Sequence, residues 1–256
     1  MSNEVIALLS FLFLSVLAVA GGWFGRAYLF CLLVAYVLLS NFTFPLEVDI
    51  FGSSISWAII MYSVSYLILD ILIERYSTVD AYKAAFLGLC SQMLLFVYLW
   101  LFWPATLAGD SKAVAEYIGA AFADGSGLVT LAALVSSIGW FANIFIYDFM
   151  KKKAGGKEGI HIAARNIVST LVGQLLNTII IFAIVRPDDV TAPLAFIATA
   201  VLFKWIIAFV DTPLLYFATL VIPASTPPAV TDAAPPAPPT DPAPDSGPSD
   251  AEPTPA

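Results

Sequence analysis

Polar side chains recur in an apolar stretch, residues 165 to 185, that is long enough to cross a bilayer. At about 100° per residue, its polar and small residues share one arc of roughly 140°. The arc contains Asn166, Ser169, Thr170, Gly173, Gln174 and Asn177, and the opposite side contains Val168, Leu171, Val172, Leu175, Leu176 and Ile179. Hydroxyl and amide groups in a membrane either bind neighbouring helices or line the path of a polar substrate. Six polar or small residues in one arc favour the substrate path.

A second polar face is expected on the apolar run at residues 56–73, where Tyr66, Asp70 and Glu74 recur every four residues. Their spacing places the two carboxylates one helical turn apart on the same side. Ionisable residues are rare in membrane segments and mark substrate or proton paths. We therefore expect Asp70 to bind substrate or relay protons, whereas Glu74 is close enough to the helix end to reach water instead.

Lys204 is the deepest charge in the chain, within the apolar run at residues 192–222. A charge at mid-bilayer costs about 2.5 to 3.5 kcal/mol on insertion scales, so its ammonium group should face the interior and meet a partner. Asp211 lies seven residues further on, on nearly the same face and roughly 10 Å away along the helix. Asp70, Asp148 and Asp211 are the candidate partners.

Two further charges flank the lysine-rich connection at residues 151–157. Asp148 closes the run before it and Arg165 opens the run after it, so an ion pair between them would join two helix ends. Either side chain could instead reach interfacial water.

Amide and aromatic groups form a stripe on the run at residues 128–150, consisting of Ser136, Trp140, Asn143 and Tyr147. Asn41 interrupts another apolar run near its end. Taken together, the polar faces offer amides, aromatic planes and carboxylates, a combination that suits a flat polar heterocycle better than an ion or a lipid.

These side chains need membrane helices to position them, and the composition predicts such helices. The 256 residues are 60% hydrophobic and 12% charged, against about 25% charged in ordinary soluble domains. Seven apolar runs cover residues 5–22, 27–46, 56–73, 84–103, 128–150, 165–185 and 192–222. We therefore predict an all-α, polytopic transmembrane bundle, with an N-terminal helix in residues 1–26, a six-helix body in 27–222 and a tail in 223–256. The N-terminal run follows Glu4 and no Lys or Arg, which argues against a cleaved signal peptide.

Lys and Arg residues predict the orientation. The first, third and fifth connections carry eight of them, against two on the other side, so these connections should be cytoplasmic. The N-terminus then lies on the outer side of the cell inner membrane, and the tail lies on the cytoplasmic side. That tail holds 12 of the 17 prolines and no aromatic residue, which predicts disorder. A short helix could form in the 104–127 loop.

Several classes of function are disfavoured. The two cysteines lie in apolar runs and there is one histidine, so we expect neither a disulfide, a metal site nor a cofactor. There is no glycine-rich phosphate loop and no basic nucleic-acid footprint. Asp70 and Asp148 lack the Gly-x-Gly-Asp pattern of an intramembrane aspartyl protease, so no enzyme is expected. One alternative is a membrane scaffold or sensor whose acidic tail acts as the effector segment. The chain could also form homo-oligomers.

Four short patterns occur in order along the chain. They are Asp70 to Tyr76, Tyr147-Asp148, Arg165 to Thr178, and Lys204 with Asp211-Thr212-Pro213. From about Tyr28 to Ile222 the chain thus resembles the queuosine precursor transporters, also called the vitamin-uptake-transporter-like family.

The resemblance implies import of 7-cyano-7-deazaguanine or 7-aminomethyl-7-deazaguanine, purine-like bases salvaged for a tRNA nucleoside. Asn177 stands where the family more usually has Asp, and Ser77 where it has Gly. An alternative is a substrate-binding component for another purine or vitamin that works with a separate ATPase module. By resemblance and residue type, the expected binding or coupling residues are Asn41, Tyr66, Asp70, Glu74, Asn143, Asp148, Arg165, Ser169, Gln174, Asn177, Lys204 and Asp211.

Overall fold

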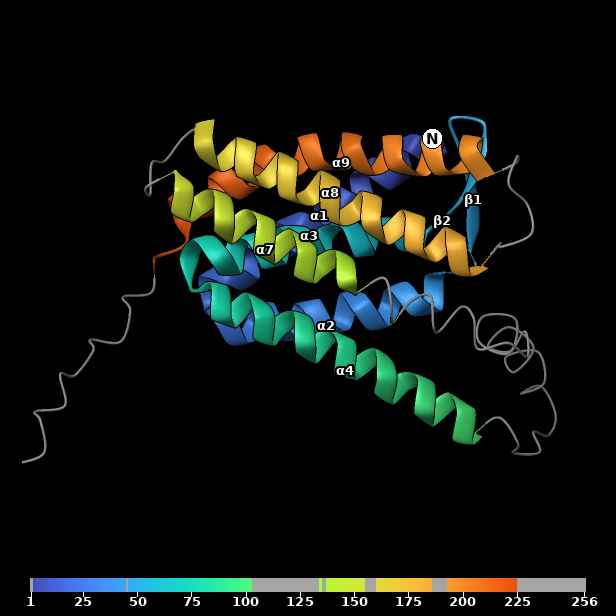
Figure 1. Ribbon diagram of the computed structural model, residues 1–256, viewed down its shortest axis with the longest axis horizontal. Helices are drawn as coiled ribbons and strands as arrows, with labels where there is room; N and C mark the ends of the chain where they lie inside the picture. The colour runs from blue at the N-terminus through green and yellow to red at the C-terminus, as the bar shows by residue number, and fades with distance from the viewer. Residues whose placement is uncertain are drawn as a thin grey trace, which may run out of the picture. The chain divides into compact units, whose positions relative to one another are not determined.

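A computed structural model describes residues 2–44, 46–102, 134, 137–154, 160–185 and 193–224 of the chain. Seven α-helices lie in these ranges: α1 (Asn3–Phe24), α2 (Arg26–Thr43), α3 (Ala58–Arg75), α4 (Thr78–Phe102), α7 (Ile138–Lys153), α8 (Ile160–Val185) and α9 (Pro193–Val221). Each corresponds to one predicted apolar run, so the helical membrane bundle is confirmed (Figure 1). The 104–127 loop, Ser136 and the tail from residue 225 lie outside the described residues.

Four of the described helices are long and apolar enough to cross a membrane on their own. These stretches are Asn3–Phe24, Arg26–Thr43, Thr78–Tyr98 and Ala198–Val221. The other three helices, α3, α7 and α8, carry most of the buried polar side chains. Their polar groups therefore have to be matched by partners within the protein, because hydrocarbon offers none.

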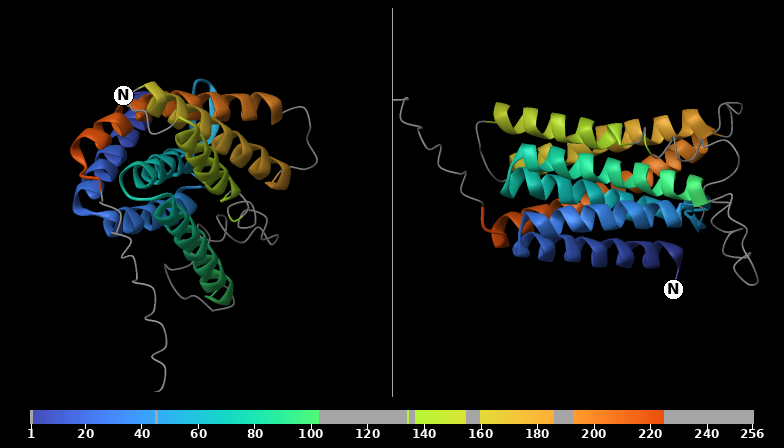
Figure 2. Two further views of the ribbon diagram at one scale, coloured as in Figure 1. Left: turned by 60° about the vertical axis from the view of Figure 1, so that its left-hand side comes forward. Right: turned by 90° about the horizontal axis from the view of Figure 1, so that it is seen from below.

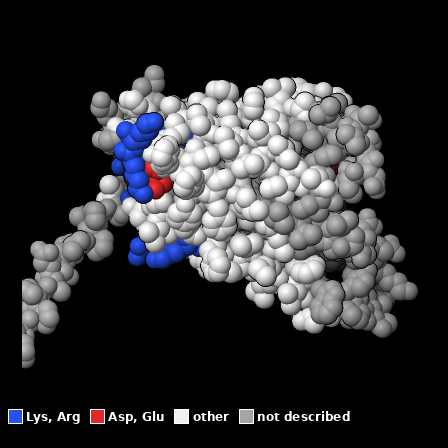
Figure 3. All heavy atoms as spheres, viewed as in Figure 1, with Lys and Arg blue, Asp and Glu red and all other residues white. Residues whose placement is uncertain are grey.

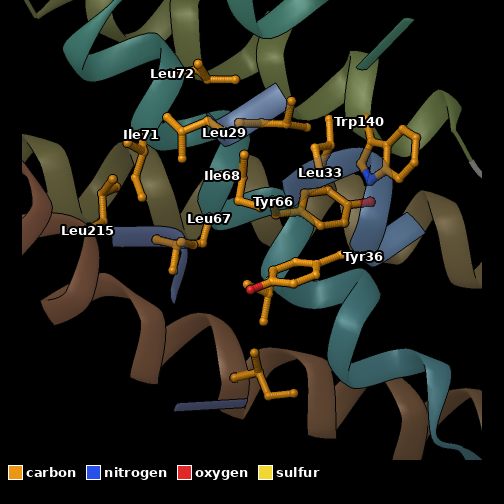
Figure 4. Close-up of a cluster of buried hydrophobic side chains, with 14 of the residues drawn as sticks. Leu29, Leu33, Tyr36, Tyr66, Leu67, Ile68, Ile71, Leu72, Trp140 and Leu215 are labelled. Atoms are coloured by element: carbon orange, nitrogen blue, oxygen red, sulfur yellow. The ribbon is translucent and has the colours of Figure 1, made fainter. Parts of the chain in front are cut away.

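Helix α3 lies at the centre of the bundle and contacts each of the other six described helices. Every residue from 63 to 73 is buried, as expected for a helix whose sequence is apolar on nearly all sides. Figure 4 shows its side chains among those of α2, α7 and α9. The polar side chains in this range, Ser63, Ser65, Tyr66 and Asp70, are consequently removed from both water and lipid.

The connections that join α1 to α2 and α3 to α4 are short. Gly25 has a φ of 116°, in the region that favours glycine, and separates α1 from α2. Helix α4 begins six residues before its apolar run, because the Ser77 hydroxyl accepts a hydrogen bond from the Asp80 backbone N–H at 3.0 Å. Ser77 thus supports the start of α4.

The connection between α2 and α3 has regular structure that the sequence analysis does not predict. It forms a hairpin of two antiparallel strands, β1 (Glu47–Ile50) and β2 (Ser53–Ser56). The turn residues Phe51 and Gly52 both have positive φ, as a tight two-residue hairpin requires. Ile50 and Ile55 point into the core and are buried. The strands are only four residues long, so their alternation is too brief to identify in the sequence.

Positively charged side chains gather at one end of the bundle, as Figure 3 shows in blue. Arg26 pairs with Asp80 at 3.3 Å, and Lys151 pairs with Glu74 at 3.2 Å, so the start of α2 lies beside that of α4, and the end of α3 beside that of α7. The last turn of α9 reaches the same end, since Ile222 packs beside Gly22. We call this the cationic end; Figure 2 shows the helices running from it side by side.

Helices α7 and α8 cross with their backbones almost in contact. A Cβ atom added to Gly139 would lie 2.6 Å from the Gly173 carbonyl oxygen, and one added to Gly173 would lie 2.7 Å from that of Gly139. Small residues allow such close approach between membrane helices. The crossing also brings the phenol of Tyr66, on α3, against both helices.

Gly173→Ala should therefore lower the free energy of unfolding by about 1–3 kcal/mol, because the new methyl group meets backbone that cannot move aside. Gly21→Ala is the matched control, since its methyl group would meet only the movable end of the Leu32 side chain. Alanine also favours a helix over glycine by about 1 kcal/mol. Thermal unfolding in detergent, followed by tryptophan fluorescence, compares the two. Equal midpoints would contradict the close crossing.

Candidate functional site

One face of α8 carries a row of four polar side chains, each one turn from the next: Asn166, Thr170, Gln174 and Thr178. All four are at most 5% exposed. On the opposite face the apolar side chains of Val168, Val172, Leu176 and Ile179 are 36–47% exposed. The predicted polar arc is therefore turned into the protein, and the predicted apolar side is turned out.

The row begins near the cationic end with an amide and a carboxylate. The Asn166 side-chain amide donates hydrogen bonds of 2.8 Å to Asp211 Oδ1 and to Thr212 Oγ1, both on α9. Asp211 is fully buried. Its other oxygen, Oδ2, and the Asn166 Oδ1 have no hydrogen-bond partner among the described residues. This end of the row consequently presents buried acceptors.

Asp70 faces the second position of the row from the central helix. It accepts a hydrogen bond of 2.8 Å from the Asn143 amide and one of 3.4 Å from the Thr170 hydroxyl. Three helices, α3, α7 and α8, thus meet at one carboxylate with no exposed surface. Burying a carboxylate is costly unless hydrogen bonds compensate. Asn143 and Thr170 supply these hydrogen bonds to Asp70.

Lys204 lies at the far end of the row, on α9. Its ammonium group donates to Asn177 Oδ1 at 2.8 Å and to Thr178 Oγ1 at 2.9 Å. The ion pairs of the described residues do not include Lys204. The expectation of an aspartate partner was therefore wrong: helix spacing shows which face a side chain occupies but not which neighbour it reaches.

Gln174 lies between these two ends. Its amide nitrogen and oxygen are both buried, and neither has a hydrogen-bond partner in the described part of the chain. Most buried polar side-chain atoms are hydrogen-bonded, so one with none calls for an explanation. Gln174 presents a donor and an acceptor together, which an amide edge of a ligand could satisfy.

The cationic end is closed by a network around Glu74. Its carboxylate accepts from Arg165 at 2.7 Å and from the Tyr147 hydroxyl at 2.8 Å, and it pairs with Lys151 at 3.2 Å. The Arg165 side chain is only 3% exposed and lies over the Tyr147 ring. This network joins α3, α7 and α8.

The expected pair between Asp148 and Arg165 does not form. Asp148 instead accepts from the Thr78 hydroxyl at 2.7 Å and pairs with Lys152 at 2.6 Å, one turn along its own helix. The rotation of α7 turns Asp148 toward α4 and water, and leaves Arg165 to Glu74.

Other predicted residues do not extend the row. Asn41 donates to the Val37 carbonyl of its own helix at 2.8 Å. The Ser169 hydroxyl likewise donates to the Arg165 carbonyl at 2.7 Å. Tyr66 is buried beside Gly139 and Gly173, where it lies next to the polar row.

Three residues that hold the site together, Trp140, Thr170 and Thr178, were absent from the twelve expected binding or coupling residues. Trp140 is fully buried, donates to the Ser65 hydroxyl at 2.9 Å and stacks on Tyr62 with ring centroids 5.1 Å apart. Thr170 and Thr178 hold Asp70 and Lys204. Thr170 lies on the predicted polar arc of α8 and Thr178 follows Gln174 by one turn, and these positions were the available signal. Among the described residues, no three or more His, Cys, Asp and Glu side chains gather as they would around a metal ion.

Comparison with known proteins gives two matches. A family described as "Putative vitamin uptake transporter" matches residues 56–218, a range that contains the whole polar row. The chain is also similar to the "Probable queuosine precursor transporter" of Bacillus subtilis (strain 168). The identity is 28% over 207 residues, which cover 78% of this chain and 87% of that protein. No solved structure matches the chain significantly.

The Glu74 network predicts unequal effects of two similar substitutions. Glu74→Gln should lower the free energy of unfolding by about 3–5 kcal/mol, because it leaves the buried Arg165 without a counter-charge. Asp148→Asn, at the same end, should cost about 0–1 kcal/mol, since its partner Lys152 is 76% exposed. Thermal unfolding in detergent measures both. An Asp148→Asn variant as unstable as Glu74→Gln would show that burial is not what distinguishes these ion pairs.

Proposed function

Because the family match covers more than half of it, the chain belongs to the putative vitamin uptake transporter family, and we propose that it imports a queuosine precursor. The observation that carries the proposal is the buried Gln174 amide in a row of polar side chains, since neither of its polar atoms has a hydrogen-bond partner among the described residues. The name of the similar Bacillus subtilis protein supports the choice of cargo. The proposal assigns no catalytic step to the chain.

The proposed cargo is 7-cyano-7-deazaguanine or 7-aminomethyl-7-deazaguanine. Each is a planar bicyclic base with a ring amide, whose oxygen accepts and whose N–H donates. The Gln174 amide can pair with such an edge through two hydrogen bonds. Asp70 and Asp211 lie on the same side of Gln174 and offer acceptors to the 2-amino group. The row thus has the hydrogen-bonding groups that a guanine-like base requires.

The proposal includes an orientation in the membrane. Lys and Arg residues concentrate at the cationic end, and the positive-inside rule assigns such an end to the cytoplasm. In a bacterial cell inner membrane, the Glu74 network would then close the cytoplasmic side of the row. The tail, which follows α9, would also be cytoplasmic.

Gln174→Ala should reduce import by at least about tenfold, because a buried polar group that binds a ligand is worth about 1–3 kcal/mol. The measurement is the queuosine content of tRNA in a bacterium unable to make or import the precursors, at low external concentration of either base. Leu176→Ala is the control on the outward face of the same helix, and the amounts of both variants in the membrane are compared by immunoblot.

Two results would count against the proposal. If the wild-type chain reaches the membrane and restores no queuosine, the cargo is another purine or vitamin, as the family description allows. If Gln174→Ala imports as well as Leu176→Ala, the binding site lies elsewhere. Proteoliposomes containing only this chain test the second candidate, a binding component that depends on a separate ATPase module, since that component would take up no base alone.

Removing residues 225–256 should leave import within about twofold of the full chain. The segment is acidic and proline-rich and lacks aromatic side chains, so it contributes little apolar surface to a folded transporter. The same tRNA assay measures the outcome. Loss of import, with unchanged amounts in the membrane, would favour the alternative in which the tail is an effector segment.

A further inference from the structure

The polar row has two ends of opposite hydrogen-bonding character. At one end, Asp211 Oδ2 and Asn166 Oδ1 are buried acceptors without partners among the described residues, and the Asp70 carboxylate binds Thr170, the next side chain of the row. We call this the acceptor end. At the other end Lys204 presents an amine that already donates to Asn177 and Thr178. We call this the donor end.

The two ends are separated by a distance that a bicyclic base can bridge. Lys204 and Asp211 are seven residues apart on α9, roughly 10 Å of helix rise. On α8, Thr170 binds Asp70 and Thr178 binds Lys204, eight residues and about 12 Å apart. Gln174 lies midway between these threonines. A ligand paired with Gln174 would therefore extend one edge toward each end.

The two proposed cargo bases differ at one edge. Both carry hydrogen-bond donors at one edge, the ring N–H and the 2-amino group. Near the other side, the 6-oxo group is next to the 7-substituent. A 7-cyano group is uncharged and accepts hydrogen bonds, whereas a 7-aminomethyl group is a primary amine that is protonated at neutral pH and donates them.

Resting on the proposed function, we propose that Lys204 makes this site select the 7-cyano base over the 7-aminomethyl base. With the donor edge at the acceptor end, the 6-oxo and nitrile groups face Lys204, and donors meet acceptors throughout. In this orientation the 7-aminomethyl base places its ammonium group against Lys204, so two donors face each other. In the reverse orientation its ring N–H and 2-amino group face Lys204, which again places donors against a donor. The 7-aminomethyl base therefore meets an unfavourable contact with Lys204 in either orientation.

Asn177 holds the Lys204 amine in place without neutralising its charge, which the proposed selectivity requires. Its side-chain oxygen accepts a hydrogen bond from the Lys204 amine at 2.8 Å but carries no charge to neutralise it. A carboxylate in the same place would form an ion pair with Lys204 and reduce its repulsion of a second cation. Asn177 therefore acts as a positioning residue for the selectivity of Lys204.

The test compares initial uptake of the two radiolabelled bases by cells that neither make nor import them, with the wild-type chain and three variants. The wild-type chain should take up the 7-cyano base with at least about tenfold higher efficiency at low concentration. Lys204→Met and Asn177→Asp should each reduce this ratio at least about fivefold. The ratio is read within one variant, so it does not depend on how much protein folds. Asn177→Asp supplies Lys204 with an ion pair, so it tests the proposal even if Lys204→Met fails to reach the membrane.

Leu176→Ala, on the outward face of α8, should leave the ratio unchanged. Equal uptake of both bases by the wild-type chain would overturn the assignment of selectivity while leaving the proposed function intact. A wild-type preference that Asn177→Asp does not alter would overturn the role of Lys204. Uptake of neither base, with the protein in the membrane, would overturn the proposed function itself.

Discussion

A bilayer interior offers no hydrogen-bond partners, so the polar side chains of α8 depend on partners within the protein, and the partners on other helices organise the bundle. Asn166 binds Asp211 on α9, and Thr170 binds Asp70 on α3. Thr178 binds Lys204, on α9 again. These contacts determine how α8 is rotated and how far it is shifted against its neighbours. Gln174 is the position on the row that this pairing does not use.

The faces of the helices could be predicted from the sequence, because helical periodicity alone decides them. Residues 166 to 179 alternate between buried polar and exposed apolar side chains as a period of 3.6 requires. Asp70 and Glu74 share a face for the same reason, and both look toward α7 and α8. The seven helices follow equally from the seven apolar runs.

The partners could not be predicted, because they depend on how each helix is rotated and which helix it meets. Arg165 reaches Glu74 rather than Asp148, and Lys204 reaches an amide and a hydroxyl rather than a carboxylate. The contact between Gly139 and Gly173 joins residues on two helices, with no pattern inside either that would reveal it. Helical periodicity predicts the faces of one helix at a time, whereas the contacts of a site depend on how several helices pack.

The central position of α3 has a consequence for how the protein is made. Asp70 and Glu74 enter the membrane early in synthesis, but Thr170 and Arg165, which bind them, follow 100 and 91 residues later. A charge at the centre of an isolated helix costs about 2.5 to 3.5 kcal/mol on insertion scales. Until α7 and α8 emerge from the ribosome, α3 therefore depends on shelter from the insertion machinery or from α1, α2 and α4. Biogenesis of this bundle must be cooperative, with its middle completed last.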